Sequence, residues 1–187
     1  MDFKEIKTDY MIRTNKGVPM FYGGILIWLI LGFLSFVLPE EINAYIYLAS
    51  TGVFFPVGIF VSKLLGIDFF AKDNPLSTLG GLLGALQLLF APLLIAVGFE
   101  HYEWVPFVVG VLTGAHFLPF MWLYESRAML FQTIATVLVS TIVGLVFIEM
   151  ALTLVPLALS IVYFITAMLI RREVAALKVQ IDSTVSI

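Results

Sequence analysis

The chain has 187 residues, of which 61% are hydrophobic and only 12% charged, and its mean hydropathy is +1.06. Because soluble domains carry about 25% charged residues, a water-soluble fold is excluded and the chain is expected to lie in a lipid bilayer. The lack of cysteine excludes disulfides, iron–sulfur clusters and cysteine nucleophiles, and no basic block with interleaved aromatic residues indicates nucleic-acid binding.

Residues 1–17 are polar and of mixed charge, and they form an N-terminal cytoplasmic segment in front of the first apolar run. Phe3, Ile6 and Tyr10 recur at helical spacing, so one interpretation is a helix lying on the membrane surface. The other interpretation is a solvated tail.

The chain between residues 18 and 170 divides into six apolar runs, each close to the about 20 residues that a membrane-spanning helix needs. Residues 171–187 follow as a cytoplasmic tail that is expected to continue as a short helix. The predicted fold is therefore all-α, an integral membrane bundle of six transmembrane helices. The expected spans are 18–38, 42–65, 76–97, 104–124, 128–148 and 150–170.

Basic residues are confined to the two terminal segments and to alternate connections between the runs. With six spans they all fall on one side of the membrane, and the positive-inside rule makes that side cytoplasmic. Both termini are then cytoplasmic, and one span more or fewer would scatter the basic residues over both sides. The residues are Lys4, Lys7, Arg13, Lys16, Lys63, Lys72, Arg127, Arg171, Arg172 and Lys178.

His116 is the ionisable residue that lies deepest in an apolar run. It is twelve residues into the fourth run, which at 1.5 Å per residue places it about 18 Å from the outer end, near the bilayer midplane. An ionisable group at that depth indicates a functional site, where it could bind a cation, relay a proton or hydrogen-bond a polar substrate. The alternative is a neutral histidine that hydrogen-bonds a neighbouring helix.

Proline recurs near the middle of four runs, as Pro56, Pro92, Pro119 and Pro156. A proline removes one backbone hydrogen bond and kinks a helix, so Pro119 is expected to bend the chain beside the histidine. Broken helices line transporter sites, which suggests gating. The alternative is that proline is simply common in membrane helices.

Small residues mark two helix faces. Gly80 and Gly84 share a face with Gln87 in the third run, and Gly110 and Gly114 are four apart in the fourth. Glycines at this spacing let a second backbone approach closely, so both pairs are expected to pack against other helices.

The fifth run carries a polar stripe in which Gln132, Thr136 and Ser140 are four residues apart. Lipid does not favour such a face, so it should look into the bundle. One interpretation joins it to His116 and Gln87 as the wall of a hydrophilic path. The other is hydrogen-bonded packing between close helices.

No motif for catalysis or for a cofactor is present: there is no HExxH, GxSxG, Walker A or Rossmann glycine pattern. No catalytic residue, cofactor or metal ligand is therefore assigned. Whether the protein is an enzyme stays open.

Three segments carry a resemblance: RTNKGVP (13–19), FFAKDNPLSTLGG (69–81) and GVLTGAHFLPFMWLY (110–124). Together they resemble a family of small bacterial six-span membrane proteins that has no assigned function. The resemblance implies a multi-pass protein of the bacterial cytoplasmic membrane. It brings no site residues with it, so the role of His116 depends on the physical argument alone.

Three functions remain open. The first is a small transporter or channel for an ion or small molecule, with the polar residues around His116 as its path. The second is a non-transporting membrane protein that assembles with itself or a partner through its glycine-rich faces. The third is an intramembrane enzyme acting on lipid, which would need a lipid-sized groove with His116 and Glu125 on one wall.

Overall fold

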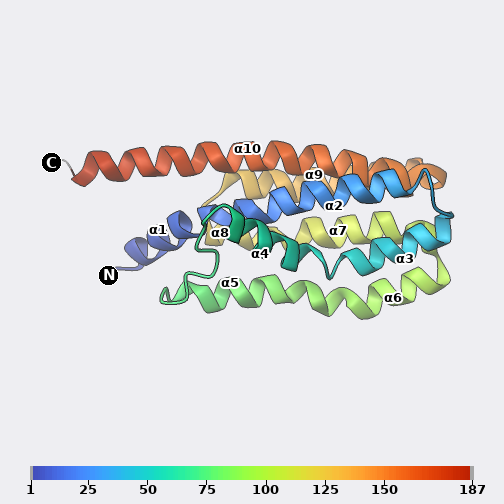
Figure 1. Ribbon diagram of the computed structural model, residues 1–187, viewed down its shortest axis with the longest axis horizontal. Helices are drawn as coiled ribbons and strands as arrows, with labels where there is room; N and C mark the ends of the chain where they lie inside the picture. Colours follow the sequence, from blue (N-terminus) through green and yellow to red (C-terminus); the bar gives the residue numbers. More distant parts are fainter. Residues whose placement is uncertain (1, 186–187) are drawn as a thin grey trace.

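The computed structural model describes residues 2–185, and all regular structure in that range is helical. The helices lie side by side along the long axis of the molecule (Figure 1). They are α1 (Phe3–Arg13), α2 (Val18–Leu34), α3 (Glu40–Ser50), α4 (Phe54–Leu64), α5 (Leu76–Ala85), α6 (Ala91–Glu100), α7 (Val105–His116), α8 (Leu118–Leu123), α9 (Arg127–Val146) and α10 (Ala151–Val185), joined in places by the short 3₁₀ segments η1 (Asn15–Gly17), η2 (Leu86–Phe90), η3 (Tyr102–Trp104) and η4 (Ile148–Met150).

Five helical segments among the described residues are long and apolar enough to cross a membrane, and the number is six if the bent pair of α3 and α4 counts as one span. These two helices meet at an angle of 57°. The all-α prediction is confirmed, and each expected run falls on helix. The first run is shorter than expected, because α2 ends at Leu34 and not at residue 38.

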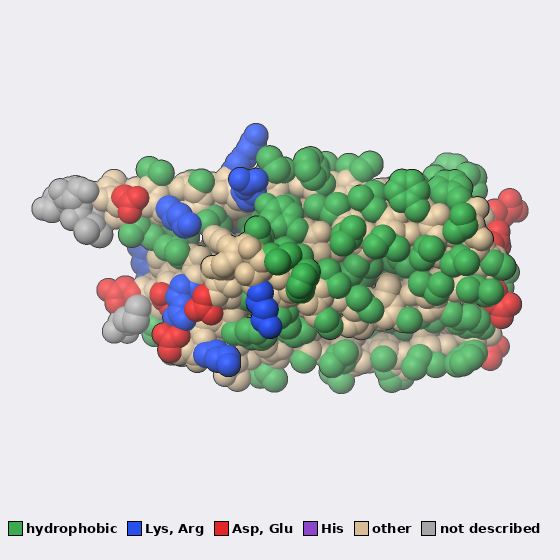
Figure 2. All heavy atoms as spheres, viewed as in Figure 1, with side chains coloured by type: hydrophobic (Ala, Val, Ile, Leu, Met, Phe, Trp, Pro, Cys, Tyr) green, Lys and Arg blue, Asp and Glu red, His purple; other side chains and the backbone are tan. Residues whose placement is uncertain are grey.

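The two ends of the bundle differ in charge. We call the end that holds α1 the basic end, because Lys16, Lys63 and Arg127 lie at helix termini there. The opposite, acidic end carries Glu40 and Glu149, and the face drawn in Figure 2 shows red but no blue side chains at that end. A band of hydrophobic side chains separates the two ends (Figure 2), as expected for a protein surrounded by lipid.

The N-terminal segment is a helix that packs against the bundle. Its first turn is closed by a capping box, in which the side chains of Asp2 and Glu5 each accept a backbone N–H of the other residue. Tyr10 and Met11 are buried, whereas Phe3 is exposed. The buried side of α1 therefore faces the protein and holds the helix across the basic end.

Ion pairs fasten α1 to the loop between α4 and α5. The Arg13 guanidinium donates hydrogen bonds to Asp68 and to Asp73, including a bond of 2.9 Å from Nη1 to Asp73 Oδ2. That bond lowers the pKa of Asp73 below its ordinary value. Asn74 Nδ2 also donates to the Ile6 carbonyl at 2.8 Å and to Asp9 at 2.9 Å. Helix and loop thus form one polar contact outside the apolar band.

The interior is formed mainly by α2 against α10 and by α7 against α9. Gly110 lies against the side chain of Ser140, and a methyl group on Gly114 would approach the backbone nitrogen of Val137 to 3.0 Å. These two glycines therefore let α7 and α9 approach closely. α10 continues through Pro156 without interruption.

The third candidate span, Leu76–Glu100, contacts the bundle least. Only 11% of its most apolar window is buried, against 56% for the span Asn15–Leu34. Figure 1 shows it along one edge of the bundle. Most of its surface is therefore exposed on the outside of the bundle or toward its own side of the cavity.

Candidate functional site

Three interruptions of the helices surround one cavity. α3 and α4 are separated by residues 51–53, α5 and α6 by η2, and α7 and α8 by Phe117. Thr51, Leu88 and Phe117, one residue from each interruption, line a cavity of about 590 Å³. This volume lies within the range of about 300–1,000 Å³ that is usual for small-molecule sites. Discontinuous helices around a cavity are also how membrane transporters build their sites.

The wall of the cavity is mostly apolar and aromatic. Its few polar side chains include His116, Gln87 and Thr113, which come from α7 and η2. Such a wall suits a ligand with a large apolar body and few polar groups. The aromatic residues of the wall are Tyr10, Phe21, Phe54, Phe55, Phe69, Phe70, Phe117, Phe120, Tyr124 and Tyr163.

His116 is an ionisable residue on this wall in addition to the tyrosines, and it is buried, with 7% of its surface exposed. Among residues 2–185, its Nδ1 atom has no hydrogen-bond partner. Its ring contacts the edges of Phe117 and Phe120, with centroids 5.8 and 5.5 Å away. These contacts do not include the hydrogen bond from His116 to a neighbouring helix that the alternative interpretation expects.

Three of the four mid-span prolines stand at the interruptions. Pro56 follows the break between α3 and α4, Pro92 begins α6, and Pro119 begins α8. Each deprives the carbonyl four residues earlier of its helical donor. Two of these carbonyls belong to Gly52 and Leu88, which line the cavity, and the third immediately precedes the candidate histidine. The Leu88 carbonyl still accepts the backbone N–H of Ala91, and the Ala115 carbonyl accepts that of Phe117, so the prolines mark the breaks without leaving these two carbonyls free.

The glycines of the third span also border the cavity. Gly80 faces the hydroxyl of Tyr10, and a methyl group on Gly84 would lie 3.8 Å from the ring of Phe55. Neither meets the backbone of another helix, so this pair differs from the close α7–α9 contact. Here the absent side chains leave room in the cavity.

The polar stripe of α9 lies elsewhere. Gln132 Nε2 donates to Thr136 Oγ1 at 2.9 Å, and Gln132 Oε1 accepts from Thr166 Oγ1 at 2.6 Å. These residues and Ser140 are fully buried, and none of them lines the cavity. The structure therefore brings Gln87 to the same cavity as His116 but not the stripe. Its hydrogen bonds join α9 to α10, as in the packing interpretation.

The basic end of the cavity is covered by α1. The ring of Tyr10 stacks on that of Tyr124, with centroids 5.8 Å apart and planes 9° apart. Tyr124 stacks in turn on Phe120 at 5.9 Å, and all three residues line the cavity. The aromatic stack therefore separates the cavity from the basic end.

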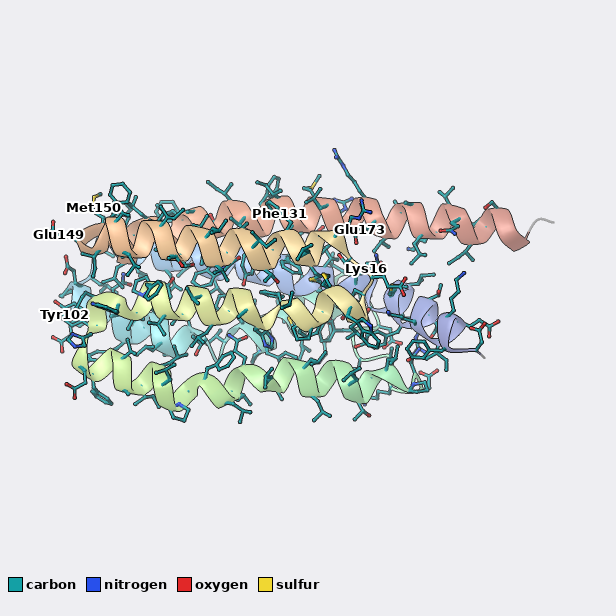
Figure 3. All side chains as sticks on the ribbon, turned by 180° about the vertical axis from the view of Figure 1, so that it is seen from behind. Lys16, Tyr102, Phe131, Glu149, Met150 and Glu173 are labelled. Atoms are coloured by element: carbon teal, nitrogen blue, oxygen red, sulfur yellow. The ribbon has the colours of Figure 1, made fainter. Side chains whose placement is uncertain are left out.

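Two lysine–glutamate pairs hold this cover. Lys7 Nζ lies 3.0 Å from Glu125, and Lys16 Nζ lies 3.0 Å from Glu173. Glu173 also accepts the backbone N–H of Ala128 at the start of α9. Lys16 and Glu173 lie close together in Figure 3, near the basic end. The junction of α1 and α2 is thereby tied to both α9 and α10.

The acidic end has a separate hollow of about 330 Å³ between Glu40, Glu103 and Glu149. Glu149 is labelled in Figure 3 at the end opposite to Lys16. Within residues 2–185, no group of three or more histidine or acidic side chains is arranged to hold a metal ion.

Thr113 and Tyr163 are among the residues of the cavity wall that the sequence did not single out. Thr113 is three residues before His116 on α7, so helical spacing could have indicated it. Tyr163 comes from α10, and its own segment holds no sign that it faces the fourth span. Their places at the cavity depend on how distant segments pack.

The sequence profile of the DUF7010 family, a family of unknown function, matches residues 3–173. The match covers nearly the whole chain, and the chain therefore belongs to this family. No curated protein and no solved structure matches it. The expected membership of a family without an assigned function is confirmed, and the family name supplies no substrate.

Proposed function

We propose that the protein is a small transporter whose cargo is a small molecule with a large apolar body and one or two hydrogen-bonding groups. The observation that carries this proposal is His116, a nearly buried side chain on the wall of a 590 Å³ cavity, whose Nδ1 lacks a partner among residues 2–185. Leaving such a group unsatisfied costs about 1–3 kcal/mol. A polar group on the cargo would recover that free energy.

The cavity offers two side chains for recognition of the polar group. His116 comes from α7 and Gln87 from η2, and imidazole and amide can each donate and accept hydrogen bonds. The aromatic wall supplies contacts for the apolar body of the cargo. Selectivity would then come from the position of the polar group relative to the body.

The third span is the element proposed to move. It is weakly buried, and η2 interrupts it beside the cavity. A 3₁₀ segment in the middle of a helix often marks a hinge, and weakly packed elements open most easily. Movement of α5 against α6 would change the access to the cavity without disturbing the α2–α10 core.

The proposed setting is the bacterial cytoplasmic membrane, crossed six times, with α3 and α4 as one bent span. The basic end is then cytoplasmic by the positive-inside rule. Both α1 and the C-terminal part of α10 lie at that end (Figure 1).

The structure offers less support for the other two functions. The Gly110–Gly114 face packs inside the chain, and the Gly80–Gly84 face borders the cavity, so neither is left over for a partner. Glu125 is not among the residues that line the cavity with His116, so the arrangement expected of a lipid-acting enzyme gains no support.

The proposal can be tested by cysteine labelling, because the natural chain has no cysteine. Thr113→Cys places a thiol on the cavity wall, and Thr133→Cys places one in the α9 interior, outside that wall. The two threonines are matched in type and burial, with exposures of 5% and 8%. Each variant is treated with a membrane-impermeant sulfonated maleimide in right-side-out and in inverted vesicles.

A transporter opens its site to each side in turn, so Thr113→Cys should react in both vesicle orientations and Thr133→Cys in neither. Labelling of Thr113→Cys from only one side, or from neither, would contradict transport. Equal labelling of the two variants would show that the reagent reports general loosening and not the cavity.

A further inference from the structure

A second set of polar groups lies buried without partners, apart from His116. These groups are Trp28 Nε1, both amide atoms of Asn43, and the hydroxyls of Tyr47 and Tyr163. Each side chain is at most 1% exposed, and none of these atoms makes a well-formed hydrogen bond among residues 2–185, although the Trp28 indole N–H lies near the Tyr163 hydroxyl. Because about 90% or more of buried polar groups in proteins are hydrogen-bonded, five such atoms in one region call for a common explanation.

The four side chains form one cluster. The ring of Trp28 lies 5.4 Å from that of Tyr47 and 6.0 Å from that of Tyr163. Asn43 is four residues before Tyr47 on α3, which places the two on the same helical face. The cluster therefore joins α2, α3 and α10 in the interior of the bundle.

The cluster also lies between two hollows. Glu40, Asn43, Tyr47 and Thr51 are spaced by three, four and four residues along α3 and its end, so they form one stripe. Glu40 lines the hollow at the acidic end, whereas Thr51 lines the 590 Å³ cavity. At 1.5 Å per residue the stripe is about 16 Å long.

We infer that this stripe, with Trp28 and Tyr163, binds a row of water molecules that runs from the acidic end to the cavity. The indole N–H donates, the amide both donates and accepts, and the two hydroxyls do either. A buried water molecule typically makes about three hydrogen bonds, so a few waters would satisfy all five atoms. Tyr163 lines the cavity, and the row would end there.

The row gives the cavity a route for water that is separate from the polar stripe on α9. In that stripe Gln132 already bonds Thr136 and Thr166, whereas Ser140 Oγ has no partner among residues 2–185. The proposed row is bordered by polar groups, whereas the cavity wall is mostly apolar. Water would thus reach the cavity from the acidic end. The inference concerns a different site from the proposed function and does not depend on it.

The first test is the contact of Trp28 with water, measured by NMR on ¹⁵N-tryptophan protein in deuterated detergent. Trp104 and Trp122 are 43% and 53% exposed and serve as internal references. The Trp28 indole proton should show a nuclear Overhauser cross-peak to water with the sign of a long-lived contact. Absence of that cross-peak, while the references exchange with water, would overturn the inference.

The second test distinguishes a hydrated hydroxyl from a dry one. Tyr47→Phe removes a hydroxyl that, if bound to water, stabilises the fold, so the unfolding temperature should fall and the Trp28 cross-peak should weaken. If the hydroxyl is dry, its removal takes away an unsatisfied group and the unfolding temperature should rise, which would contradict the row. Tyr102→Phe, at a partly exposed position of the acidic end, is the control and should change neither the unfolding temperature nor the Trp28 cross-peak.

Discussion

Neutralising Glu173 should destabilise the protein far more than neutralising Glu125, although both carboxylates lie 3.0 Å from a lysine. Lys16 has 6% of its side chain exposed and Glu173 24%, so that pair is largely buried. Removing one partner of a buried pair costs about 3–5 kcal/mol. Glu173→Gln keeps an oxygen that can accept the Ala128 N–H, so we expect a loss near the lower limit, about 2–3 kcal/mol.

The control differs mainly in the exposure of its carboxylate, because both lysines are buried and Lys16 also keeps a second contact, a hydrogen bond of 3.4 Å to the Glu125 carbonyl. Glu125 is 64% exposed, and exposed pairs contribute about 1 kcal/mol or less. Lys7 also lies 4.3 Å from the ring centroid of Trp122, so a cation–π contact remains when the carboxylate is neutralised. We therefore expect Glu125→Gln to cost less than about 1 kcal/mol.

The assay is thermal unfolding of purified variants in one detergent. Since 1 kcal/mol shifts the melting temperature of a chain of this size by roughly 2–4 °C, Glu173→Gln should lower it by about 4–12 °C and Glu125→Gln by only a few degrees. The double variant Lys16→Met with Glu173→Gln should regain much of the loss, because no unpaired charge is left. Equal shifts for the two single variants would refute the argument that burial decides the difference.

Two further predictions concern acid stability and helix packing. The hydrogen bond from Arg13 lowers the pKa of Asp73, so the ionised Asp73 stabilises the fold above the ordinary pKa of 3.8, and this stabilisation is lost as the pH falls through the lowered value. The unfolding temperature of the natural chain should therefore fall more steeply below pH 3.8 than that of Asp73→Asn. Parallel curves for the two proteins would contradict a stabilising Arg13–Asp73 interaction. Gly114→Ala would bring a methyl group within 2.8 Å of the Val137 side chain and should cost about 1–3 kcal/mol in thermal unfolding. Gly81→Ala, which meets nothing within 4 Å, should be neutral or stabilising by up to about 1 kcal/mol, and a similar loss in both variants would exclude close packing as the cause.

The sequence predicted those features of the fold that depend on local composition. Apolar runs separated by charged residues indicated the membrane helices, and the charge asymmetry of the connections reappears as the two ends of the bundle. The bend between α3 and α4 was only suggested by Pro56, because a proline shows where a helix can break and not how far it turns. The docking of α1 depends on Arg13 and Asn74 meeting distant partners, which no local pattern contains.

The candidate site was predictable in part, for a related reason. The depth of His116 could be counted along its run, but whether its ring would meet a partner depended on the neighbouring helices. Gln132 is likewise a polar residue inside an apolar run, but its side chain accepts a hydrogen bond from Thr166 on α10. Asn43 and Tyr47 are at helical spacing in the sequence, but the lack of hydrogen-bond partners for their polar atoms becomes evident only when α2 and α10 are placed beside them.

The cavity is therefore bounded differently at its two ends. Toward the basic end, the stacked rings of Tyr10 and Tyr124 and the buried Lys16–Glu173 pair cover it. Toward the acidic end, the proposed water row connects it to solvent without an opening wide enough for a molecule of cargo size. The cavity is open at its side, where the lining residues Phe55, Phe70 and Leu88 are exposed, whereas opening to the basic end would require α1 to move and to break its ion pairs. If the protein is a transporter, Glu125→Gln should then increase labelling of Thr113→Cys from the basic end, because it weakens the cover at little cost to the fold.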